Sequence, residues 1–237
     1  MASNGETHMS TVDRILAATE DLLVSSDKVE KISIRHIAAQ ANVSASVINY
    51  HFSGRDNLLR EVVGGIYKRF TSERQLLLQM AMDADVGDEE KRRMAIAALV
   101  GPSVRWSLNP RSSYQAFVNL GALTNGATQR EGRPIGEARV KRLHPFIAAF
   151  KILCPWLSEA EIGFRIHAAL GIRSNVTRDR GRMEALMGGH RIADPERIIG
   201  MMVEVILPMF SPPPQPAAEK ADRDAPRPAN RTETAEG

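Results

Sequence analysis

Apolar residues recur at helical spacing along most of this chain, and no segment alternates in the manner of a β-strand. The first helical segment covers residues 11–25, where Ile15, Ala18 and Leu22 fall on one face. The next covers residues 34–41, with an apolar face at i, i+3, i+4 and i+7. Ser33 is suited to cap its N-terminus, and Asn42 tolerates the left-handed conformation that ends a helix. The pattern predicts an all-α fold.

Residues 33–59 read as two short helices joined by a tight turn, followed at once by a third helix. Ser44 is positioned to open a helix over 45–51, and Ile48 is predicted to point inward. Ser53 is predicted to cap the third helix, with Asp56 completing an approximate capping box. Together these segments predict a helix-turn-helix, whose second helix fits the major groove of DNA.

The outward face of the second helix is small and polar near its N-terminus, where a groove-inserted helix contacts bases. We expect base contacts from Ser46 and Asn49, and phosphate contacts from Tyr50, His51, Arg55 and the Ser33 cap. The full set of candidate DNA-binding residues is Ser33, Arg35, Ser44, Ala45, Ser46, Asn49, Tyr50, His51 and Arg55. Two alternatives stay open: the Tyr50 ring packs on the domain, or His51 is a core or capping histidine.

The stretches RILAATEDLL at 14–23, SIRHIAAQANVS at 33–44 and INYHFSGRDNLL at 48–59 resemble the TetR family of bacterial repressors. The resemblance runs from about residue 10 to residue 63, and the YHF triplet followed by a polar turn is its most specific part. It implies a homodimer with an N-terminal three-helix DNA-binding domain and a divergent C-terminal domain for ligand and dimer contacts. Asn42, Asn49 and Arg55 depart from the family's usual Gly, aromatic residue and Lys.

Further helices are predicted over residues 54–80, 88–106, 114–128, 135–153, 158–178 and 194–210. A bend is expected at His144-Pro145 in the helix over 135–153. Asp88 is expected to cap its helix, which Gly101-Pro102 should kink or end. Ser158 with Glu161 predicts a capping box, and Asp194 followed by Pro195 predicts another helix start.

The chain is therefore expected to divide into a leader at 1–9, a helix-turn-helix domain at 10–64, a helical effector and dimer domain at 65–210, and a tail at 211–237. The tail is rich in Pro, Ala and charge without periodicity, which is typical of disorder. The helix from residue 194 is apolar almost all round, so it must be buried on more than one side. Either it pairs with the helix before it in an intersubunit four-helix bundle, or both lie in an ordinary intramolecular core.

A sensor needs a pocket, and the middle helices carry aromatic side chains with a few polar residues among them. The candidate ligand-binding residues are Trp106, Tyr114, Phe117, Asn119, Leu120 and Phe146. A largely hydrophobic effector, such as an acyl chain, an aromatic or a terpenoid, would suit such a site.

Charge and composition narrow the function. The net charge of the 237 residues is +3, yet residues 1–65 hold six Lys/Arg and eight Asp/Glu, which disfavours promiscuous DNA binding. No apolar run predicts a membrane span or a secretory signal, so a cytoplasmic protein without membrane partners is expected. The single cysteine, Cys154, excludes an intrachain disulfide.

No phosphate loop, paired-cysteine motif or HExxH appears, and the six histidines lack ligand spacing, so no catalytic residue, metal or cofactor is predicted. The expected function is a ligand-responsive transcriptional regulator, a repressor that binds a palindromic double-stranded operator as a homodimer and is released by a small effector. The alternative is an all-helical small-molecule carrier with a vestigial DNA motif.

Overall fold

The computed structural model of the protein describes residues 9–26, 29–114 and 140–214. Within these ranges every regular element is a helix, which confirms the predicted all-α fold. The N-terminal part contains α1 (Thr11–Ser25), a short 3-10 turn η1 (Val29–Lys31), α2 (Ile34–Ala41), α3 (Ala45–Phe52) and the long α4 (Arg55–Asp83). The remaining elements are α5 (Asp88–Leu108), α8 (His144–Leu153), α9 (Glu159–Arg178), α10 (Arg180–Leu186), α11 (Pro195–Ile206) and η2 (Leu207–Phe210).

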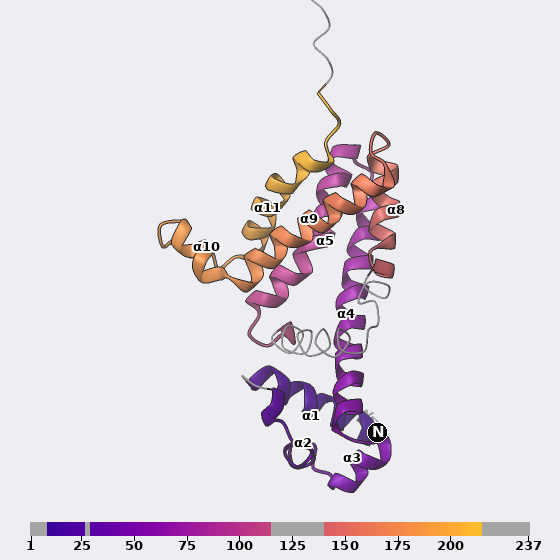
Figure 1. Cartoon of the computed structure of the whole chain (residues 1–237), viewed down its shortest axis with the longest axis vertical. Coiled ribbons are helices and arrows are strands. Elements are labelled where there is room, and N and C mark those ends of the chain that lie inside the picture. Colours follow the sequence, from indigo (N-terminus) through magenta and orange to yellow (C-terminus); the bar gives the residue numbers. More distant parts are fainter. Residues whose placement is uncertain (1–8, 27–28, 115–139, 215–237) are drawn as a thin grey trace, which may run out of the picture.

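Two separate apolar cores organise these helices. The first is formed by α1, α2, α3 and the start of α4, with Ile15, Ile37, Ile48 and Leu58 fully buried at its centre. The second lies farther along α4 and is completed by α5, α8, α9, α11 and η2. Figure 1 shows the first group at one end of α4 and the second group around its other end.

Helix α4 runs without a break from one core to the other. Its 29 residues correspond to about 43 Å at the α-helical rise of about 1.5 Å per residue. Its buried residues include Val62 and Ile66 in the first core and Leu78 in the second, so a single rigid element belongs to both. The helix continues through Gly64-Gly65.

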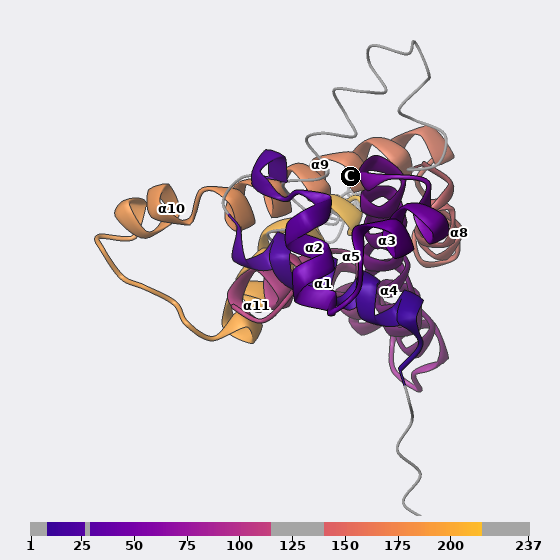
Figure 2. The ribbon, with the colours of Figure 1, turned by 90° about the horizontal axis from the view of Figure 1, so that it is seen from below.

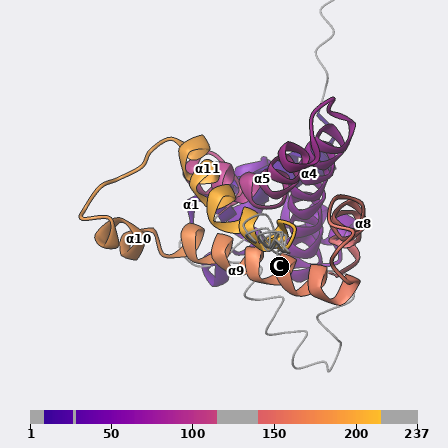
Figure 3. The same ribbon diagram turned by 90° about the horizontal axis from the view of Figure 1, so that it is seen from above.

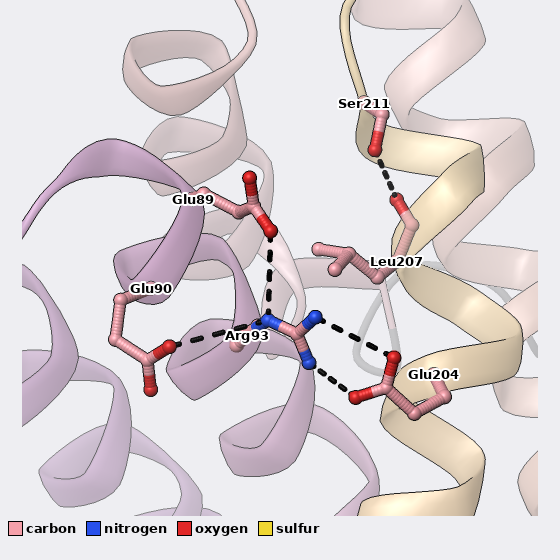
Figure 4. A network of polar contacts seen from close by, with 6 residues as sticks. All are labelled: Glu89, Glu90, Arg93, Glu204, Leu207 and Ser211. Atoms are coloured by element: carbon pink, nitrogen blue, oxygen red, sulfur yellow. Dashed lines mark hydrogen bonds and ion pairs between the residues drawn. The ribbon is translucent and has the colours of Figure 1, made fainter.

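The second core is closed by polar contacts between distant segments. Arg92, which is buried, donates from Nη1 to the Leu153 carbonyl at 3.1 Å. At the surface, the Arg93 guanidinium of α5 pairs with the Glu204 carboxylate of α11, and Glu89 and Glu90 lie beside it (Figure 4). Because this second set is exposed, it contributes little to stability and mainly sets how the two helices align.

Helix α10 departs from the compact arrangement and projects sideways from the body (Figure 3). It was not predicted from the sequence. Asp179 caps it by accepting from the Arg182 amide at 3.1 Å, and Gly188 and Gly189 at positive φ turn the chain back toward α11. None of its residues is buried in this chain, and Leu186 is 83 % exposed.

Several helix caps were predicted correctly. Ser33 accepts from the His36 amide, Asn42 is left-handed at φ 52°, and Ser158 with Glu161 forms the expected capping box. Asp194 also caps α11 as predicted, by accepting from the Glu196 amide at 3.0 Å.

Two predictions about helix N-termini were wrong. Ser53 does not cap α4: it ends α3 in a left-handed conformation, so Gly54 takes the N-cap and the expected box with Asp56 does not form. Gly87, not Asp88, is the N-cap of α5.

Two further predictions concern proline. Helix α5 does not end at Gly101-Pro102: Gly101, Pro102 and Ser103 are all buried in its interior, where packing offsets the single lost backbone bond. In the segment predicted as one helix over 135–153, α8 starts at His144, where a bend was expected, with Leu143 as its N-cap and Pro145 in its first turn.

The predicted helix at 114–128 lies almost entirely outside the described residues, as do most of the predicted leader and tail. Among the described residues, no helix combines the length and the apolar character needed to cross a bilayer.

Candidate DNA interface and effector region

Helix α3 presents two contrasting faces. Ile48 and Phe52 are buried in the first core, while Ser46, Asn49, Tyr50 and His51 are exposed. Helices α2 and α3 lie at the end of the molecule farthest from the second core (Figure 1). In the view from below they lie in front of the helices of the second core (Figure 2). The predicted recognition face is therefore unobstructed by any described part of the same chain.

The turn between α2 and α3 is held by backbone bonds. The Asn42 amide donates to the Ala39 carbonyl at 3.3 Å, and the Val43 amide donates to the Ala38 carbonyl at 3.0 Å. Asn adopts the left-handed conformation at lower cost than most residues, which explains how it serves here without glycine. The angle between the two helices is thus fixed by the chain itself.

The N-terminus of α3 carries two hydroxyl groups. The Ser44 hydroxyl makes no capping bond to its own helix and lies 2.9 Å from the Ser46 hydroxyl, with Ala45 half-buried between them. Free backbone N–H groups and hydroxyls at a helix N-terminus suit phosphate oxygens.

The side chains of Tyr50 and His51 are exposed on the surface of the domain. Tyr50 is 84 % exposed, and its ring contacts the His51 ring edge-on at a centroid distance of 5.1 Å. The alternative in which the Tyr50 ring packs on the domain does not hold, and His51 is not a core histidine.

On α2, Arg35 is exposed, while Ser33 is engaged as the helix cap. The His36 ring nitrogen Nδ1 lies 3.1 Å from the Lys31 carbonyl oxygen, which fixes the ring near the start of α2. Arg35 is therefore the cation of α2 that is free to reach a DNA backbone.

Arg55 has a different role from that of an exposed cation. Its Nε donates to the Ile32 carbonyl and its Nη2 donates to the Val29 carbonyl, both at 2.6 Å. These bonds tie the start of α4 to the segment before α2, and the side chain is 29 % exposed. Only the remaining part of the guanidinium, next to Asp56 at 3.3 Å, faces outward.

Three of the predicted ligand residues lie among the described residues. Trp106, at the end of α5, stacks edge-on against Phe70 at 5.3 Å and donates from its indole nitrogen to Glu73 at 2.8 Å. Phe146, at the start of α8, is fully buried, and Tyr114 is half-buried. Phe117, Asn119 and Leu120 lie outside the described residues.

Two residues of this region, Arg74 of α4 and Arg173 of α9, were not predicted from the sequence. Both continue an apolar stripe at i+4 spacing: Arg74 follows Ile66 and Phe70, and Arg173 follows Ala169. A lone cation on the inward stripe of a helix was the signal that could have found them.

This end of the second core also touches the first. Glu20 of α1 accepts from Arg69 of α4 at 2.5 Å and from the Ser113 hydroxyl in the segment after α5. Trp106 packs partly against the first core as well. The end of α5 and the segment after it are therefore the described contact between the two units, in addition to α4.

Known proteins share both parts of this arrangement. Residues 15–62 match the family model of bacterial regulatory proteins of the tetR family, and residues 97–207 match a tetracyclin repressor-like C-terminal domain. Together the two matches cover more than half of the chain. No curated protein sequence matches it.

Solved structures with the same fold come from several bacteria. A transcriptional regulator from Rhodococcus sp. Rha1 aligns with a TM-score of 0.57 and 18 % identity, over 85 % of this chain and 96 % of that chain. A TetR-like regulator from Rhodococcus sp. RHA1 aligns at 0.51 with 16 % identity, over 84 % and 93 %. The TetR family regulator PfmR of Thermus thermophilus aligns at 0.50 with 16 % identity, over 84 % and 96 %.

Proposed function

Because this chain belongs to the TetR family of bacterial regulatory proteins, whose members regulate transcription, we propose that it is a homodimeric repressor released from its operator by a small effector. The observation that carries this proposal is the exposed polar face of α3, which lies opposite the buried Ile48. One continuous helix, α4, connects this first unit to the second core. A helix like α3 reads bases, and such a body is placed to sense a ligand.

The polar residues divide into two roles in this proposal. Ser46 and Asn49 face the base edges, since they lie on the outward face of α3. Ser33, Arg35, Ser44, Ala45, Tyr50 and His51 approach the sugar-phosphate backbone, and Arg55 does so only with its outward edge.

A dimer is supported by the apolar surface of α9 and α11. Phe164 is 73 % exposed, Val205 63 % and Met201 48 %. Met201 and Val205 also line a groove, together with Ile172 of α9 and Met183 of α10. All the side chains that line this groove are apolar. Exposure of so many large apolar side chains to water is unfavourable, so we expect a second copy of the chain to pack against this surface. Two copies also supply the two recognition helices that a palindromic operator requires.

Coupling between effector and operator is proposed to run through α4 and the end of α5. Tilting α4 moves α3 of each protomer, and the two recognition helices must lie about 34–36 Å apart to enter successive major grooves. An effector weakens DNA binding only if it binds the DNA-incompetent dimer more tightly. A coupling free energy of about 1–3 kcal/mol would weaken operator binding roughly five- to 150-fold.

A mobility-shift titration with DNA from upstream of the protein's own gene tests this proposal. At physiological salt we expect a shift that excess random DNA of equal length does not compete away, because base contacts add to the phosphate contacts. Equal competition by both DNAs would favour the alternative function, an all-helical carrier with a vestigial DNA motif.

A further inference from the structure

Arg74 lies in the interior of the second unit with donors that lack an acceptor. The residue is only 9 % exposed, and its Nε and Nη2 atoms are buried with no partner among the described residues. Its guanidinium carbon lies 5.6 Å from the ring centre of Phe70 and 5.1 Å from that of Phe146. Two aromatic faces attract a cation but accept none of its N–H groups in the plane of the guanidinium, so those donors stay unsatisfied.

Arg173 brings a second positive charge to the same region. Its Nη1 donates to the Ser103 hydroxyl at 3.0 Å, while its Nε is buried without a partner among the described residues. The pKa of Arg74 falls to about 9, first because burial disfavours the charged form and second because Arg173 is a like charge nearby. Arg74 is still protonated at neutral pH, so two cations share a poorly solvated space.

No carboxylate in the described part of the chain forms an ion pair with either arginine. Other arginines of the same unit have acceptors: Arg105 binds both oxygens of Glu196, at 2.6 and 2.9 Å. Arg92, which is as buried as Arg74, reaches the Leu153 carbonyl at 3.1 Å. Among the described residues, Arg74 and Arg173 therefore differ from Arg105 in having no carboxylate partner. Arg74 is as buried as Arg92, whose Nε also has no partner, but differs from it in having no hydrogen-bond acceptor at all among these residues.

We propose that Arg74 and Arg173 bind the carboxylate head group of the effector, whose apolar remainder lies among the aromatic side chains beside them. A planar guanidinium matches a carboxylate with two parallel N–H···O bonds, which the unsatisfied Nε and Nη2 of Arg74 are placed to supply. The inference rests on the proposed function and narrows its effector from a hydrophobic compound to a hydrophobic acid.

The position of Arg74 also suits a sensor. Its guanidinium lies over the Phe70 ring, and Phe70 packs edge-on against Trp106, which packs partly against the first core. An anion that repositions the Arg74 guanidinium would thus act on α4 one turn from the contact between the two units.

The test measures binding to the full-length protein without DNA. The probes are octanoate and octanol, which share an apolar chain and differ in charge, and the pair 2-naphthoate and 2-naphthalenemethanol. Calorimetric titration should show that at least one acid binds wild-type protein more tightly than its alcohol. In Arg74→Met the acid should bind at least about tenfold more weakly, the scale of a lost charged hydrogen bond, while the alcohol should be unaffected.

Arg92→Met is the matched control, since Arg92 is equally buried but has its own acceptor and lies against Trp156. It should keep the preference for the acid. A second measurement, without ligand, tests whether the variants fold. The melting temperature of Arg74→Met should be no lower than that of wild type: no hydrogen bond or ion pair of the described chain is lost, and removing a buried charge offsets the loss of its two contacts with aromatic rings. Arg92→Met, which loses a buried hydrogen bond, should melt at a lower temperature.

Two results would overturn the proposal. In the first, neither acid binds wild type more tightly than its alcohol. In the second, Arg74→Met keeps the acid preference of wild type. Neither result depends on DNA, so a protein that prefers acids but fails to bind an operator would contradict the proposed function and leave this inference standing.

Discussion

Replacing Arg55 with alanine separates a structural role of this residue from a DNA-contacting one. The change removes two charged hydrogen bonds, from Nε to the Ile32 carbonyl and from Nη2 to the Val29 carbonyl, both 2.6 Å long. Each bond links residues more than twenty positions apart, so no local rearrangement can replace it.

The expected cost follows from the environment of the two bonds. Hydrogen bonds to charged groups contribute about 1.5–3 kcal/mol each. Because the Arg55 side chain is 29 % exposed, the lower end of that range applies, and Arg55→Ala should lower the free energy of unfolding by about 3 kcal/mol. Arg55→Lys keeps the charge but reaches one carbonyl at most, so about half of the loss should remain.

Urea denaturation followed by circular dichroism measures these differences. Arg60→Ala is the matched control, since Arg60 lies on the same helix, is exposed, and bonds only to Asn57 among the described residues. It should change stability by less than about 0.5 kcal/mol, as surface substitutions usually do. If Arg55→Ala were as stable as Arg60→Ala yet bound all DNA sequences more weakly, Arg55 would contact phosphate and would not stabilise the fold by joining α4 to the segment before α2.

Three further predictions concern other parts of the molecule. Asn49→Ala should relax sequence preference, seen as a larger loss of affinity for operator than for random DNA; equal losses would remove Asn49 from the base-reading face. Phe164→Glu should convert the dimer to a monomer in sedimentation equilibrium, while Leu76→Glu, at a 62 % exposed site on α4, should not; a dimeric Phe164→Glu would move the interface elsewhere. Cys154 is fully buried and burial raises its thiol pKa to about 11, so at pH 8 it should react with Ellman's reagent only as fast as the protein unfolds; rapid reaction would contradict this burial.

The sequence predicted the helix-turn-helix because its signals are local. Ser33 and Asn42 bracket α2 within nine residues of chain, and Ile48 marks the inward face of α3. Ser158 and Glu161 identify the start of α9 in the same way. Each of these signals depends only on residues that are close together in the sequence, so it does not require knowledge of the tertiary structure.

Several features that the sequence did not predict depend on packing between distant segments. Arg55 resembles a surface cation in sequence, but its acceptors lie on the segment before α2. Pro102 resembles a helix breaker, but α5 continues through it inside a closed core. Arg74 and Arg173 come near each other only when α4 and α9 both pack against α5. Their proximity therefore cannot be predicted from the sequence, although the cation on each apolar stripe can be recognised.

The central claim, that α3 reads a specific palindromic operator as part of a dimer, is tested most directly by selection from random double-stranded DNA. Purified full-length protein should enrich inverted repeats whose half-site centres are separated by about one helical turn, or roughly 10–10.5 base pairs, because two α3 helices must enter successive major grooves. Enrichment of no sequence, with retention of DNA that depends only on salt, would contradict the claim.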